Sequence, residues 1–113
     1  MKELFKIKDM PFYEEDFLDE IEEYEDIIPI IQELADSLSY EKISCVEINE
    51  CCKVSKDNYY VEIHGYINSQ DEFITKEEKE KFENVLNKEK LDLFVIRIYK
   101  CVDCEKWIID ILE

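Results

Sequence analysis

Cys101 and Cys104, in the stretch KCVDCEKW, are the residues of this chain whose types and spacing most suggest chemistry. Two thiolates on a tight turn can supply half of a tetrahedral zinc site. The same spacing at the start of a helix supports a reversible disulfide, because the helix field lowers the pKa of the first thiol. In a third interpretation the pair lies in a β-hairpin turn and both thiols are only structural.

A zinc site needs further ligands, and the chain has no second pair with this spacing. Cys51 and Cys52 are adjacent, and adjacent side chains on a strand point to opposite faces. We therefore expect only one of them to reach an ion. The metal hypothesis is a zinc site made by Cys101, Cys104 and Cys51 and completed by His64 or a water.

The hairpin interpretation explains the segments on each side of the pair. A two-residue loop of Val102 and Asp103 would place Cys101 opposite Cys104, whereas a register two positions longer would place Arg97 opposite Asp110. Both lack the Gly or Asn that such short loops prefer, so a longer loop is a further alternative. Redox chemistry is the weaker interpretation because Asp103 opposes thiolate formation and the segment that follows is a poor helix.

Charge is the second unusual feature of the chain. It has 30 acidic and 14 basic residues, a net charge of −16, and no Lys or Arg between Asp9 and Glu41. Such a field repels nucleic acid and attracts a basic protein surface, so we expect a protein partner and no direct contact with nucleic acid. The expected partner-binding residues lie on one helical face and beside it. They are Glu15, Asp16, Asp19, Glu20, Glu22, Glu23 and Asp26.

Other classes of function have little support. The single glycine leaves no phosphate-binding loop, and no cofactor is expected apart from the zinc of the metal hypothesis. Nothing activates a Cys51 and His64 pair, so we predict a non-enzymatic protein of the inhibitor, immunity or adaptor type. The alternative is a thiol-metal or redox protein. No apolar run approaches the about 18 residues of a membrane span, and we expect a soluble, cytoplasmic, bacterial or phage protein.

Hydrophobic periodicity predicts the elements that must position these residues. Apolar residues recur at helical spacing, which predicts helices over 14–25 and 26–39, the second capped by Asp26 with Pro29 in its first turn. Alternation predicts a hairpin of strands 45–54 and 59–67, joined by the turn residues SKDN and with Cys52 opposite Val61. The remaining predicted elements are a possible strand over 4–8, a helix from Thr75 to Lys88 with a capping box to Glu78, and strands over 91–101 and 107–113.

The order of these elements is α-α-β-β-α-β-β. It predicts a single α+β domain over residues 1–113, with an antiparallel sheet of about four strands and helices packed on one face. Gly65 lies in the middle of a predicted strand, which indicates a bulge or a close approach by another element. The oligomeric state and the identity of a partner are left open by the sequence.

Overall fold

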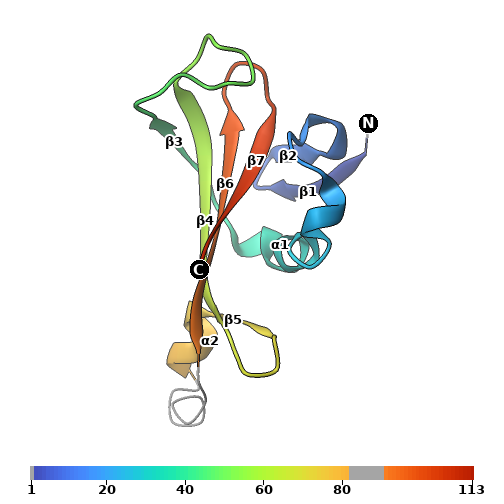
Figure 1. Cartoon of the computed structure of the whole chain (residues 1–113), viewed down its shortest axis with the longest axis vertical. Helices are drawn as coiled ribbons and strands as arrows, with labels where there is room; N and C mark the ends of the chain where they lie inside the picture. The colour runs from blue at the N-terminus through green and yellow to red at the C-terminus, as the bar shows by residue number, and fades with distance from the viewer. Residues whose placement is uncertain (1, 82–90) are drawn as a thin grey trace. The chain divides into compact units, whose positions relative to one another are not determined.

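The computed structural model of the chain describes residues 2–81 and 91–113. Among these residues the strands form a two-stranded sheet, β1-β2, and a five-stranded sheet in which β3-β4-β6-β7 are neighbours in this order and β5 pairs with β4 (Figure 1). The strands are β1 (Glu3–Ile7), β2 (Met10–Tyr13), β3 (Glu41–Ser44), β4 (Asp57–Ile67), β5 (Phe73–Thr75), β6 (Asp92–Cys101) and β7 (Trp107–Leu112). The α-helices are α1 (Ile28–Leu34) and α2 (Lys76–Lys81), and the 3-10 turns are η1 (Glu14–Asp16), η2 (Ile21–Tyr24) and η3 (Ala35–Ser37).

The predicted α+β architecture, with the order α-α-β-β-α-β-β and helices covering one face of the sheet, is wrong. The described chain is mostly β, has one main helix and begins with two strands. The strand predicted over 4–8 is present as β1, but its partner β2 was not predicted. Both errors have the same cause, because Phe5, Phe12 and Phe17 pack on Trp107 of β7 instead of contributing to a helical face.

The helix predicted over 14–25 is replaced by η1 and η2. Between them Phe17 forms a parallel bridge with Trp107, and the backbone N–H of Leu18 donates to the Trp107 carbonyl at 3.1 Å. That hydrogen bond ties the segment to the edge of β7 instead of to its own preceding turn. Repulsion between carboxylates three and four residues apart also disfavours a continuous α-helix here.

The second predicted helix is present in part. Helix α1 has Pro29 in its first turn, as predicted, and buries Ile28 and Ile31. Its N-cap is Ile27, which makes no side-chain hydrogen bond, so the predicted cap at Asp26 is wrong. Residues 35–37 continue as the 3-10 turn η3, which ends the helical region before residue 39.

Of the two strands predicted to form a hairpin over 45–67, only the second is present, as β4. The partner of β4 is β3, with Glu41 opposite Tyr60, and residues 45–56 form a loop between them. Lys53 adopts a left-handed backbone with φ of 56° and donates its N–H to the Asn49 carbonyl at 2.8 Å, which closes a turn before SKDN. The predicted pairing of Cys52 with Val61 is therefore wrong.

Strands β6 and β7 form the hairpin that the sequence predicted, with a longer loop. The Cys101 N–H donates to the Lys106 carbonyl at 2.9 Å, so residues 102–105 form a four-residue loop and the two-residue alternative is wrong. The longer register is confirmed by the ion pair of Arg97 and Asp110, whose Nη2 and Oδ2 atoms are 2.8 Å apart.

Contacts group the chain into two compact units, Met1–Val61 with Ile98–Ile109 and Glu62–Arg97 with Asp110–Glu113. The single domain stays a prediction. In the first unit Trp107 is fully buried against Phe5, Phe12 and Phe17, with ring centroids 4.4 to 5.4 Å away. Its indole N–H donates to the Tyr13 carbonyl at 2.8 Å. This aromatic core fastens the β1-β2 hairpin to β7 beside the candidate site.

In the second unit, β5 lies very close to Gly65, the only glycine in the sequence. A Cβ atom on Gly65 would lie 2.7 Å from the Ile74 carbonyl oxygen and closer still to the Phe73 ring, so the predicted close approach is confirmed. The Thr75 half of the predicted capping box is also present, because Thr75 Oγ1 accepts the Glu78 N–H at 3.1 Å, while the Thr75 hydroxyl donates to the Glu78 carboxylate at 3.2 Å. The rest of the helix predicted to Lys88 lies outside the described residues.

Within the parts of the chain that the structure describes, no helix combines the length and the apolar character needed to cross a membrane.

Candidate metal centre

Two turns of similar construction carry four of the five cysteines. In the first, the Asn49 N–H donates to the Ser55 carbonyl at 2.7 Å and the Lys53 N–H donates back to the Asn49 carbonyl at 2.8 Å. In the second, Cys101 takes the place of Asn49. Its N–H donates to the Lys106 carbonyl, and its carbonyl accepts the Glu105 N–H at 3.1 Å.

The two turns also share an unusual backbone conformation. Lys53 and Glu105, each the fifth residue of its turn, have φ values of 56° and 66°. This left-handed conformation reverses the chain immediately after Cys52 and after Cys104. Each turn thus places a thiol just before the reversal, and the second turn also carries a thiol at its first position.

The turns bring four sulfurs together from distant parts of the sequence. The Sγ atoms of Cys104 and Cys51 are 2.9 Å apart, and those of Cys52 and Cys101 are 3.7 Å apart. All four sulfurs lie within 4.8 Å of one another. Cys101 is buried, and the other three side chains are half-buried.

This arrangement fits a tetrahedral metal ion. Zinc bound by four thiolates at about 2.3 Å places neighbouring sulfurs about 3.8 Å apart. The Cys52 and Cys101 sulfurs already have that separation, and those of Cys51 and Cys104 would separate by about 1 Å to reach it. Four sulfur donors in tetrahedral array are typical of zinc or of iron bound by sulfur.

The environment of Cys101 favours a thiolate. Burial opposes its ionisation, but the Cys104 N–H, the Asn49 side-chain amide and the Asp103 N–H outweigh that effect and lower the pKa of Cys101 to about 6. The prediction that Asp103 opposes thiolate formation considered only its carboxylate and missed its N–H, which acts in the other direction. Burial, together with the neighbouring thiols of Cys104 and Cys101, raises the pKa of Cys51.

Asn49 connects the sulfurs to the rest of the first unit. Its Nδ2 donates to Cys101 Sγ at 3.3 Å and to the Asp57 carbonyl at 3.2 Å, and its Oδ1 accepts from Asn58 Nδ2 at 2.9 Å. Asn58 also donates to Cys45 Sγ at 3.4 Å. The fifth cysteine, Cys45, therefore belongs to the surrounding hydrogen-bond network and lies outside the four-sulfur cluster.

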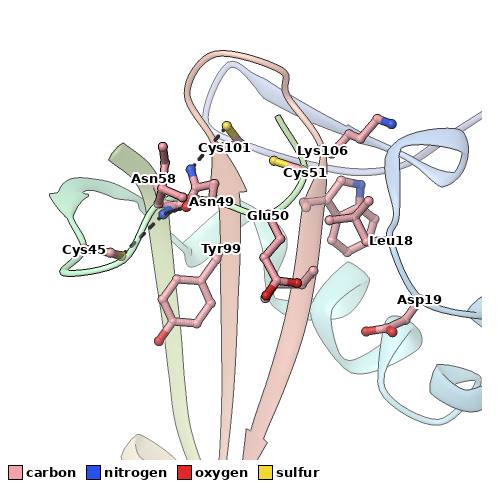
Figure 2. Close-up of a pocket in the computed structure, with 13 residues that line it drawn as sticks. Leu18, Asp19, Cys45, Asn49, Glu50, Cys51, Asn58, Tyr99, Cys101 and Lys106 are labelled. Atoms are coloured by element: carbon pink, nitrogen blue, oxygen red, sulfur yellow. Dashed lines mark hydrogen bonds between the residues drawn. The ribbon is translucent and has the colours of Figure 1, made fainter. Parts of the chain in front are cut away.

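A cavity of about 500 Å³ lies beside the cluster in the first unit. Cys51 and Cys101 are among its lining residues, whereas Cys52 and Cys104 are not. Figure 2 shows the Cys51 and Cys101 sulfurs near each other, with Tyr99 farther along the same cavity. Small molecules can therefore reach the cluster from the side of Cys51 and Cys101.

The structure brings together the three predicted metal ligands, Cys101, Cys104 and Cys51, and places Cys52 beside them. The expectation that Cys51 and Cys52 cannot approach one ion assumed a strand, whereas both lie in a turn. The cluster found among the described residues consists of cysteines alone, and the predicted ligand His64 instead has its Nε2 in contact with the Glu62 carboxylate. The sequence around Cys52 carries no local pattern that marks it as a ligand, because its approach to Cys101 depends on how the two turns fold.

The predicted partner-binding carboxylates lie in and around η1 and η2, so they do not share one helical face. All are exposed except Asp16, which is half-exposed. Glu15 accepts the Lys2 N–H with both oxygens, at 2.9 and 3.1 Å, and this hydrogen bond lowers the pKa of Glu15. Binding by these residues is not tested by their positions and stays a prediction.

Comparisons with protein-family models, with curated proteins and with solved structures found no match to this chain.

Proposed function

We propose that this is a non-enzymatic metal-binding protein in which Cys51, Cys52, Cys101 and Cys104 hold one zinc ion. The observation that carries the proposal is the convergence of four sulfurs, all within 4.8 Å, from two turns about 50 residues apart. The bound ion would cross-link the loop over 45–56 to the β6-β7 turn.

The loop over 45–56 has little apolar burial of its own that would hold it in place. It spans residues 45–56 without regular secondary structure, and Val46 and Val54 are 92% and 75% exposed. Little apolar burial is therefore available to hold the loop in one conformation. Binding of a structural zinc ion contributes directly to the stability of the folded state, which would supply what the loop lacks.

Zinc suits this site better than a hard cation because all four donors are thiolates. Calcium and magnesium select oxygen ligands, whereas thiolates select zinc, copper(I) and iron. The hydrogen bonds from Asn49 and from the N–H groups of Asp103 and Cys104 to Cys101 are the outer contacts that orient and stabilise a bound thiolate.

Metal analysis of the protein purified without chelator tests the proposal. We expect one zinc per chain by elemental analysis, and thiolate-to-cobalt charge-transfer absorption after replacement of zinc by cobalt(II). The variant Cys52→Ser should lose this absorption or weaken it strongly, since one of four ligands is removed.

Cys45→Ser is the matched control, because Cys45 is the cysteine outside the cluster. It should retain one zinc per chain and the full cobalt spectrum. Absence of metal from the wild-type protein, with no uptake on titration, would contradict the proposal. Iron in place of zinc would show that the metal is not zinc, but it would support the same four cysteine ligands.

A second candidate function is binding of a basic protein through the acidic surface made by the seven carboxylates around η1 and η2. The observation that favours it is that six of the seven are exposed, in a stretch from Asp9 to Glu41 that contains no Lys or Arg. Such a surface would steer a basic partner, so binding should be fast and sensitive to salt.

Capture of partners from lysate at low and high salt tests this role. Replacing Glu20, Glu22 and Glu23 by Gln should weaken salt-sensitive binding roughly tenfold, taking about 0.5 kcal/mol for each exposed charge contact. A control with the same change in net charge replaces Glu41, Glu77 and Glu80, and it should bind as the wild type does. Equal weakening by both triple variants would show that net charge, and not this surface, directs binding.

A further inference from the structure

We infer that Cys51 and Cys104 are a redox pair that forms a disulfide on two-electron oxidation. The inference concerns the same four cysteines as the proposed zinc site. Formation of the disulfide does not require the metal, whereas release of zinc on oxidation rests on the proposed function. The spacing of cysteines in the sequence suggests a disulfide only within the Cys101 and Cys104 pair. The structure instead places Cys104 next to Cys51 of the other turn, with their sulfurs 2.9 Å apart.

The sulfur separation of Cys51 and Cys104 is close to what a disulfide needs. A disulfide has an S–S bond of about 2.05 Å, so Cys51 and Cys104 must approach by about 0.9 Å. Cys52 and Cys101, by comparison, are separated by 3.7 Å and must move about twice as far. In addition, Asn49 donates to the Cys101 sulfur, which helps to hold that thiol in place.

Access assigns different roles to the two sulfurs. Cys51 lines the 500 Å³ cavity and Cys104 does not, so of these two sulfurs Cys51 is the one that a small peroxide entering there can reach. Both side chains are half-buried, which leaves Cys104 near the surface to complete the reaction. Figure 2 shows the Cys51 sulfur beside that of Cys101 in the cavity.

With hydrogen peroxide as the oxidant, the reaction has two steps. The Cys51 sulfur attacks one peroxide oxygen, the O–O bond breaks, and the released hydroxide takes up the thiol proton as water, which leaves a sulfenic acid. The Cys104 sulfur then attacks Cys51 Sγ, the S–O bond breaks, and the departing hydroxide leaves as water with the Cys104 proton. Two thiols lose two electrons, and one peroxide becomes two waters.

If the proposed zinc site is also correct, this reaction removes two of the four ligands. A zinc ion left with Cys52 and Cys101 has lost half of its thiolate donors, and it should be released. A thiol reductant that reopens the disulfide would restore the ligand set. The cluster would then bind metal in its reduced form and release it when oxidised.

Variants that keep only two cysteines test the redox pair without metal. One retains Cys51 and Cys104, and its matched controls retain Cys52 and Cys104, Cys52 and Cys101, or Cys101 and Cys104. In metal-free protein with one equivalent of hydrogen peroxide, we expect the first to form its disulfide roughly tenfold faster than each control, because its sulfurs are already 2.9 Å apart. Circular dichroism of each variant before oxidation checks that it folds.

Wild-type protein gives the second measurement. One equivalent of peroxide should lower the free thiols from five to three, cross-link the segment of Cys51 to that of Cys104 in peptide maps, and release any bound zinc. An equal or faster reaction in any control variant, or oxidation to sulfinic acid without a disulfide, would overturn the redox inference. Disulfide formation in a protein that never bound zinc would support this inference and contradict the proposed metal function.

Discussion

Removal of zinc is expected to lower the free energy of unfolding by about 4 kcal/mol, when the comparison is made with free zinc about 1,000-fold above its dissociation constant. The reason is that the ion binds only where both turns are formed, so its binding energy adds to the stability of the folded state. The loop over 45–56 has few buried apolar residues that could replace this contribution.

Denaturant titration with and without a chelator measures the effect, and Trp107, the only tryptophan, is the fluorescent probe. Because Trp107 belongs to the same compact unit as the cysteines, its signal should report their region. The variant Cys52→Ser should unfold at the same denaturant concentration with and without chelator. Loss of one zinc from the wild type with no change in its unfolding curve would contradict a structural role for the metal.

Truncation of Trp107 to Ala is expected to lower the free energy of unfolding by about 3–5 kcal/mol, the range for large aromatic side chains in cores. Its side chain is fully buried, contacts three phenylalanine rings and donates a hydrogen bond to the Tyr13 carbonyl. Removing it leaves a cavity where the β1-β2 hairpin, the segment around Phe17 and β7 meet.

Two further variants separate the causes of this loss. Trp107→Phe keeps an aromatic ring and removes the N–H donor, so it should cost less than Ala and include about 1–3 kcal/mol for the unpaired Tyr13 carbonyl. Leu18→Ala truncates a neighbouring side chain that is 47% exposed, and it should change stability by less than about 0.5 kcal/mol. Equal losses from Leu18→Ala and Trp107→Ala would show that Trp107 is not the centre of this core.

The two expected effects concern different ways of holding the same unit together. Trp107 fastens the N-terminal hairpin to β7 through apolar contact, whereas the cysteines would fasten the loop over 45–56 to the β6-β7 turn through a metal. A chain with a net charge of −16 carries considerable internal repulsion, so both sources of stability matter.

Features governed by neighbouring residues could be predicted from the sequence. The β-branched and aromatic residues of 91–101 and 107–113 predicted β6 and β7. The fixed φ of Pro29 predicted its position in the first turn of α1, and Thr75 with Glu78 predicted the start of α2. Each depends on chemistry within a few residues, where local preference and the final structure agree.

The segment around Phe17 and the loop over 45–56 could not be predicted in the same way. Phe17 has helical spacing with Ile21 and Tyr24, yet its ring packs on Trp107, 90 positions later. The apolar alternation of 46–54 resembles a strand, but β3 takes the place beside β4 and leaves Val46 and Val54 exposed. Burial against a distant aromatic core outweighed local periodicity around Phe17, and pairing of β3 with β4 outweighed it in the loop over 45–56.

The sequence by itself determined the charge, the β6-β7 hairpin and the presence of five cysteines, because these follow from composition and from short-range patterns. Only the tertiary structure decided which thiols meet. Cys51 and Cys104 are 53 positions apart, and their contact depends on two turns whose left-handed residues, Lys53 and Glu105, are not glycine and give no local signal. A site assembled from separate turns exists only once both are folded against each other, so the spacing within either one cannot reveal it.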